Sequence, residues 1–200
     1  MDFETHPISR DDIRIFANLI RKNYRIKTIK FPVLEFLENI ESLTNNEVDY
    51  IVEEDTLFEK KVMSYIQVNN IDYSSFTIHI RESVYKNAYN GKHADIGYIM
   101  HEISHYFMIG VFGFRPQQEI CYSSKKIPLF RSAEWQAMAL CGELMIPYEK
   151  CMMKTAKQIY HITKSSKAQV NYFEEINWFL LFSNLEYFKK EQVAARSFSG

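Results

Sequence analysis

The residues most able to do chemistry in this 200-residue chain form the run His101-Glu102-Ile103-Ser104-His105. Positions i and i+4 lie one turn apart on the same side of an α-helix, so the two imidazoles can present their nitrogens to one metal ion. In a His-Glu-x-x-His motif the glutamate beside them is the general base of a metalloprotease. The alternative is that both histidines are ordinary residues of a half-buried helix, one of them hydrogen-bonded to Glu102 or Ser104.

A catalytic zinc site needs a third protein ligand besides these histidines. No further histidine follows at the spacing of the longer metzincin motif, so a carboxylate from a second helix is the remaining common solution. The candidates are Glu119, Glu134 and Glu143. Glu134 is the best placed, because it begins a helical segment in which Ala137 and Gly142 would allow close packing on the motif helix. An acid in a first helical turn is also stabilising without any metal.

The hydrophobic pattern predicts the elements that must position these side chains. Apolar residues recur at helical spacing in some segments, and they alternate with polar residues in others. The prediction is, in chain order, a helix over 10–24, a short helix from 32 to a turn at 44–46, strands over 48–52, 63–68 and 76–80, a long helix over 96–111 that carries the motif, loops over 114–131 around a short edge strand, a helix over 132–145, and two helical stretches on either side of 163–166.

Composition favours an ordinary globular protein, with 46% hydrophobic and 24% charged residues. Because 24 Lys and Arg balance 25 Asp and Glu, no concentrated basic face is expected and direct nucleic-acid binding is not predicted. Cys121, Cys141 and Cys151 lie outside any Cys-x-x-Cys pattern, which favours a reducing compartment over a disulfide framework. The sequence shows no signal peptide and no stretch long enough to span a membrane, so we expect a cytoplasmic protein.

These residues resemble those of the ImmA/IrrE family of metallo-endopeptidases. The family carries His-Glu-x-x-His on one helix and a downstream Glu-x-x-Ala-x-x-Phe-Ala-x-x-Leu-Leu-Met-Pro-like segment, to which residues 134–147 are similar in order and spacing. The resemblance covers about residues 8–150. Met138 departs from it, because the family usually has Asn there, and Leu140 and Cys141 replace the usual Phe-Ala.

The resemblance implies the fold class and the division of the chain. We expect an α+β fold, a mainly helical zincin-like metallopeptidase domain with a small β-sheet packed on the helix of the His-Glu-x-x-His motif. This domain would cover residues 1–150, with its N-terminal helices included. Residues 151–200 would then form a C-terminal helical extension, in which the resemblance is weak.

The resemblance also implies a function. The expected activity is that of a gluzincin-like zinc endopeptidase that cuts a specific protein, typically a helix-turn-helix repressor of a mobile element or stress regulon. Zn2+ would be held by His101, His105 and Glu134, and Glu102 would take a proton from water and pass it to the leaving amine. Candidates for a donor to the oxyanion, none of which is assigned, are Tyr98, Tyr106, His93 and Arg115.

A competing hypothesis is a zinc-containing regulatory or toxin–antitoxin-like module that binds a partner protein without turnover. Glu102 argues against it, because a purely structural site needs no base beside its ligands. Three other histidines receive no role, since His6 is expected in a frayed terminal segment, His79 on the solvated outer face of a strand and His161 near a helix end. The oligomeric state is left open.

Overall fold

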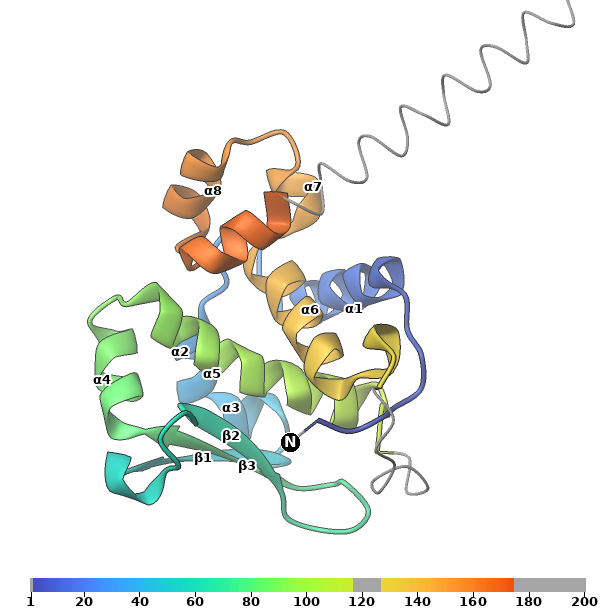
Figure 1. Ribbon diagram of the computed structural model, residues 1–200, viewed down its shortest axis with the longest axis vertical. Helices are drawn as coiled ribbons and strands as arrows, with labels where there is room; N and C mark the ends of the chain where they lie inside the picture. Colours follow the sequence, from blue (N-terminus) through green and yellow to red (C-terminus); the bar gives the residue numbers. More distant parts are fainter. Residues whose placement is uncertain (1, 117–126, 175–200) are drawn as a thin grey trace, which may run out of the picture.

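The computed structural model describes residues 2–116 and 127–174, which form a mainly helical α+β fold with one small mixed sheet, as predicted (Figure 1). Residues 167–174 are helical after the last named element. The named elements are α1 (Arg10–Asn23), α2 (Val33–Glu38), α3 (Ile40–Leu43), β1 (Val48–Glu53), the 3-10 turn η1 (Asp55–Leu57), β2 (Ser64–Val68), β3 (Phe76–Arg81), α4 (Glu82–Tyr89), α5 (His93–Tyr106), the π-helical turn η2 (Phe107–Val111), the 3-10 turn η3 (Leu129–Arg131), α6 (Ala133–Met145), α7 (Tyr148–Cys151) and α8 (Ala156–Thr163).

The sheet has the strand order β1-β3-β2, with β1 parallel and β2 antiparallel to the central strand β3. Strand β3 alternates between buried and half-buried residues, so Phe76, Ile78 and Ile80 face the helices. Ser64 pairs with Ile80 and Ile66 pairs with Ile78, which places both β2 residues on that same helix-facing side. The edge strand β2 therefore presents a serine toward the helix that lies over the sheet.

Helix α5 carries the motif and lies between the sheet and α6 (Figure 1). We predicted one helix as far as Val111, but the α-helix ends at Tyr106 and the chain continues as a π-helical turn. The turn approaches the sheet closely at Gly110, where an added Cβ would lie 2.9 Å from a ring carbon of Tyr106 and 3.0 Å from one of Phe76. Fully buried side chains that fix α5 in the core are Ile99, Met100 and Ile103.

Helices α1 and α6 complete the packing around α5. Helix α1 begins at Arg10 because the Ser9 hydroxyl accepts a hydrogen bond from the backbone N–H of Asp12. Its buried face, with Ile13 fully buried, packs on α6, and α6 in turn packs on α5. Two small or adaptable residues of α6 make this possible, because Ala137 is fully buried and the Cys141 thiol lies 3.9 Å from the carbonyl oxygen of Gly97 on α5.

The structure corrects several sequence expectations. Residues 82–89, to which no element was assigned, form α4 with Val84 and Ala88 buried. Gly142 does not mediate close packing on α5, because a Cβ added there would meet no atom within 4 Å. His79 lies on the outer face of β3 but is not solvated, since its side chain is 12% exposed and its Nδ1 lies 2.7 Å from Glu53 Oε2. A parallel stack with Tyr65 covers the imidazole.

Some sequence expectations lie outside the described residues. They are the edge strand within 114–131, Cys121, the candidate ligand Glu119 and most of the second C-terminal helical stretch. Within residues 2–116 and 127–174, no helix combines the length and the apolar character needed to cross a bilayer.

Candidate metal centre

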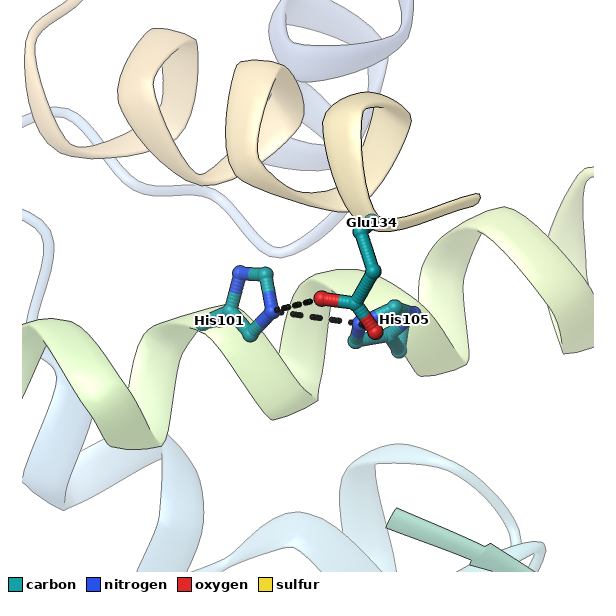
Figure 2. A group of neighbouring side chains, drawn as sticks. All are labelled: His101, His105 and Glu134. Atoms are coloured by element: carbon teal, nitrogen blue, oxygen red, sulfur yellow. Dashed lines mark hydrogen bonds and ion pairs between the residues drawn. The ribbon is translucent and has the colours of Figure 1, made fainter. Parts of the chain in front are cut away.

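Two histidines one turn apart on α5 point toward the same space (Figure 2). His101 Nε2 and His105 Nε2 are 3.2 Å apart. The ring centroids are 4.7 Å apart and the ring planes are nearly perpendicular, at 86°. The i,i+4 spacing on a regular helix brings the two side chains onto one face, and their ring orientations then bring the nitrogen lone-pair positions together.

Glu134 joins this pair from α6 (Figure 2). Its Oε2 lies 3.3 Å from His101 Nε2, and its Oε1 lies 3.5 Å from His105 Nε2. Helix α6 begins where it does because the Ser132 hydroxyl accepts a hydrogen bond from the backbone N–H of Trp135 at 3.0 Å. One ligand atom from each of His101, His105 and Glu134 lies within 4.8 Å of the others, so these residues form a group that can hold a metal ion.

The charges of the cluster are coupled even without a metal ion. Hydrogen bonding from the imidazoles of His101 and then His105 holds the pKa of the Glu134 carboxyl well below its usual range. Burial disfavours the charged form of His101, but the hydrogen bond to Glu134 and the negative charges of Glu102 and Glu134 outweigh it and raise the pKa of His101. A metal ion competes with protons for the histidine nitrogens, so metal affinity at this site should depend on pH.

The cluster opens onto a cleft of about 780 Å³. Its histidine side chains are largely covered, whereas the Glu134 side chain is 44% exposed and marks the open side. The cleft runs along β2 and the β2–β3 loop opposite α5. Its apolar lining includes Phe3, Met63, Val68, Ile71, Tyr98 and Ile109. Ile71 is 95% exposed at the loop tip, so the cleft offers apolar surface to a bound molecule.

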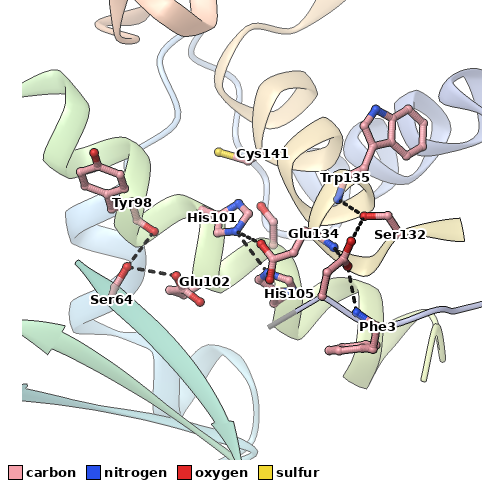
Figure 3. Close-up of polar contacts among 12 residues, drawn as sticks. Phe3, Ser64, Tyr98, His101, Glu102, His105, Ser132, Glu134, Trp135 and Cys141 are labelled. Atoms are coloured by element: carbon pink, nitrogen blue, oxygen red, sulfur yellow. Dashed lines mark hydrogen bonds and ion pairs between the residues drawn. The ribbon is translucent and has the colours of Figure 1, made fainter. Parts of the chain in front are cut away.

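Glu102 lies beside the cluster but outside it (Figure 3). Its carboxylate is largely buried and lines the same cleft. The Ser64 hydroxyl of β2 donates a hydrogen bond to Glu102 Oε1 at 3.0 Å and also lies 3.4 Å from the Tyr98 carbonyl oxygen. One carboxylate oxygen is thus held by the edge strand, which limits the orientations that the side chain can adopt.

The structure distinguishes among the three carboxylates that were candidates for the third ligand. Glu134 meets the histidines, and Glu119 lies outside the described residues. Glu143 faces α1 instead, where Arg14 donates hydrogen bonds to its Oε2 and Oε1 at 3.2 Å each and Arg10 Nε lies 3.3 Å from Oε1. A carboxylate held by two guanidinium groups is not available to a cation.

The structure also distinguishes among the candidates for an oxyanion donor, because only some of them lie at the cleft. Tyr98 lines the cleft. Arg115 lies over the ring of Tyr73, another cleft residue, at 5.2 Å. Tyr106 is buried and its hydroxyl donates to Glu47 Oε2 at 2.9 Å, and His93 packs on Tyr160 at the far end of α5. Neither of these last two side chains faces the metal-binding group.

Sequence reasoning missed two residues that contact the site. Ser64 supports Glu102 from a strand, and Asp2 contacts the first turn of α6 with a carboxylate that accepts a hydrogen bond from the Glu134 backbone N–H at 3.1 Å. No pattern in the sequence pointed to Asp2, because it is 132 positions from Glu134. For Ser64, its place at the start of an alternating strand was the only signal.

No model of a protein family matches the sequence, and no curated protein matches it either.

Proposed function

We propose that this protein is a zinc-dependent endopeptidase of the ImmA/IrrE type with a zincin-like fold. The observation that carries the proposal is the convergence of His101, His105 and Glu134 beside a buried glutamate in an open cleft. Three ligands, an adjacent carboxylate and room for a substrate are the parts that a hydrolytic metal site requires.

The spacing of the ligand atoms supports zinc. Zinc–nitrogen and zinc–oxygen bonds of about 2.0–2.1 Å place the ligands of a tetrahedral site roughly 3.3–3.4 Å apart. The two histidine nitrogens are 3.2 Å apart and His101 Nε2 lies 3.3 Å from Glu134 Oε2, close to this value, while His105 Nε2 lies 3.5 Å from the other carboxylate oxygen, Oε1. Two imidazoles and one carboxylate are also a ligand set that zinc hydrolases use.

Each residue then has a distinct part in peptide hydrolysis. Zinc, when bound, supplies the Lewis acidity that makes water a nucleophile near neutral pH. Glu102 accepts the proton from the attacking water and delivers it to the leaving amine. The Ser64 hydroxyl holds the Glu102 side chain in place through its hydrogen bond to Oε1. Tyr98 lines the same cleft and is the candidate donor to the oxyanion.

The edge of the sheet supports a peptide as the substrate. Within the described part of the chain β2 pairs with β3 on one side only, and β2 residues line the cleft. An extended segment can add to such an edge through backbone hydrogen bonds. The apolar lining around Ile71 favours apolar side chains in that segment.

We further propose that the substrate is a helix-turn-helix transcriptional repressor and that the protein acts in the cytoplasm. The family resemblance supports the substrate. The buried, free thiols of Cys141 and Cys151 support a reducing compartment. The rival hypothesis, a zinc module that binds without cutting, leaves Glu102 and its serine contact without a purpose.

The test is to incubate the zinc-loaded protein with the helix-turn-helix repressor encoded nearest to its own gene and to record intact masses. Wild type should yield two discrete fragments, and formation of both should stop with a zinc chelator. Glu102→Gln should keep its zinc and lose cleavage by about 10²–10⁴-fold. Equal cleavage by wild type and Glu102→Gln would remove the mechanism. A zinc-loaded wild type that binds the repressor and leaves it whole would favour the rival hypothesis.

A further inference from the structure

The N-terminal segment, which we expected to be frayed, lies along the chain that leads into α6. Glu4 forms an antiparallel bridge with Ser132, and the Thr5 backbone N–H donates to the Arg131 carbonyl oxygen at 2.8 Å. Thr5 is fully buried. The segment is therefore paired with residues 130–133, and its first described residues lie against the first turn of the helix that carries Glu134.

This segment satisfies the free N–H groups at the start of α6. The first N–H groups of an α-helix have no partner within the helix. Here the N–H of Ala133 donates to the Phe3 carbonyl oxygen at 3.0 Å, and the N–H of Glu134 donates to Asp2 Oδ1 at 3.1 Å. The N–H of the next residue donates to the Ser132 hydroxyl. Two of these three donors depend on residues from the other end of the chain.

Asp2 also binds the capping serine. The Ser132 hydroxyl, which accepts from Trp135, donates its own proton to Asp2 Oδ2 at 2.7 Å (Figure 3 shows Ser132, Trp135 and Phe3 around this turn). The Asp2 carboxylate thus links the N-cap residue to the backbone of Glu134. A negative charge at a helix N-terminus is in addition favourable to the helix dipole.

Glu134 needs this support more than the histidines do. His101 lies within α5, and His105, one residue before its end, is followed by the buried π-helical turn η2, whereas Glu134 is the second residue of α6, where helices fray first. Its side chain is 44% exposed, and its carboxylate oxygens face the two imidazoles. The position of its backbone therefore decides whether the carboxylate reaches the metal.

We propose that Asp2 is a positioning residue for the metal ligand Glu134, so that the N-terminal segment completes the metal centre. The inference rests on the proposed metal site. Asp2 acts through two contacts, one to the ligand's own N–H and one to the N-cap hydroxyl. Its loss lets the first turn of α6 fray and weakens metal binding without removing a ligand.

The experiment measures zinc affinity by chelator competition in the full chain. Residues that support a metal ligand change affinity by about 10–100-fold when removed, and the solvent exposure of Asp2 places Asp2→Ala near the lower limit, at about tenfold. Asp2→Asn keeps one oxygen acceptor for the Glu134 N–H but loses the charge and the second acceptor for Ser132, so it should recover only part of the loss. The matched control is Glu4→Ala, which removes the ion pair with Arg131 in the same segment and leaves the α6 turn untouched. It should bind zinc as wild type does.

A second measurement separates positioning from a general loss of structure. The visible absorption of the cobalt-substituted protein reports ligand geometry, and it should change in Asp2→Ala and return toward wild type in Asp2→Asn. Equal zinc affinity and an equal cobalt spectrum in wild type and Asp2→Ala would overturn the inference. So would an equal loss in Asp2→Ala and Glu4→Ala. If wild type and His101→Ala bind zinc equally weakly, the metal site itself is wrong, whereas tight binding by wild type with no effect of Asp2 leaves the site standing.

Discussion

Helix α6 carries two glutamates that have opposite surroundings. Glu134 and Glu143 are nine residues apart, which at 3.6 residues per turn places them on opposite faces of the helix. Glu134 faces two histidines of α5 and its side chain is 44% exposed. Glu143 faces Arg10 and Arg14 of α1 and its side chain is 2% exposed.

The type of the partner decides what each carboxylate can do. Arginine stays charged at every pH that proteins meet and has no lone pair to offer, so the Glu143 cluster is a closed ion pair. Neutral histidine offers a lone pair, so the imidazoles beside Glu134 can bind a metal ion. Two glutamates of one helix therefore have different roles. Glu143 belongs to a structural contact at one end of α6, and Glu134 belongs to a candidate metal centre at the other.

The Glu143 cluster also extends into the C-terminal part of the described chain. Arg14 lies 3.7 Å from the centre of the Tyr148 ring, and Arg10 donates to the Tyr172 hydroxyl at 3.2 Å. These contacts join α1, α6, α7 and the helical residues 167–174. The arginines thus hold α6 from the side opposite the metal-binding group.

The largest contrast is expected in metal content. Glu134→Ala removes a ligand, so zinc affinity should fall by more than the roughly 10–100-fold typical of a supporting residue. Glu143→Ala should keep about one zinc per chain. Metal analysis of the two purified variants measures this directly. If Glu143→Ala loses zinc while Glu134→Ala retains it, the roles assigned to the two carboxylates are reversed.

The next contrast concerns stability, and here Glu143→Ala should have the larger effect. Removing Glu143 takes away the buried carboxylate shared by two partly buried guanidinium groups and leaves Arg14 only its ion pair with the exposed Asp11, so Glu143→Ala should lower the free energy of unfolding by about 3 kcal/mol. Glu134→Ala should change it by less than about 1 kcal/mol when zinc is removed by a chelator, because the Glu134 side chain is 44% exposed and solvent screens its ion pairs. Denaturant unfolding with chelator present compares the two variants. Equal losses would show that burial does not distinguish them.

A smaller effect should follow from changing the arginine itself. Arg14→Lys keeps the charge but loses the paired hydrogen bonds to Glu143 and the planar contact with Tyr148. We expect a loss of about 1 kcal/mol, on the scale of one cation–π contact and one hydrogen bond. Thermal unfolding should show it, and zinc content should stay at the wild-type value. A zinc loss would mean that the two faces of α6 are coupled.

The smallest effect is predicted for Met138, one turn after Glu134. The ImmA/IrrE family, which the sequence resembles, usually has Asn at this position. Its side chain is exposed and does not line the cleft. Met138→Asn should change the free energy of unfolding by no more than about 0.5 kcal/mol, as exposed substitutions usually do, and should leave zinc affinity unchanged. A clear gain in zinc affinity would instead place this position in support of the metal centre.

The local parts of the site could be predicted from the sequence. Two histidines at i and i+4 meet because the helical repeat alone sets their separation, and the alternation of Phe76, Ile78 and Ile80 predicts which face of β3 is buried. The helix that carries Glu134 follows from its own N-cap serine and apolar spacing. The sequence analysis missed α4 altogether and placed the end of α5 too late, because the chain continues after Tyr106 as a π-helical turn that packs closely at Gly110.

The choice among distant groups needed the tertiary structure. Spacing on one helix shows that Glu134 and Glu143 face opposite ways, but it does not show which face meets histidines and which meets arginines. That depends on how α6 packs between α5 and α1, since the contacts join residues more than 30 positions apart. Asp2 and Ser64 also reach the site through contacts between segments that are far apart in the sequence. No short-range repeat in the sequence predicts such contacts. The sequence by itself determined the chemistry that could occur, and the packing of the helices decided which side chains take part.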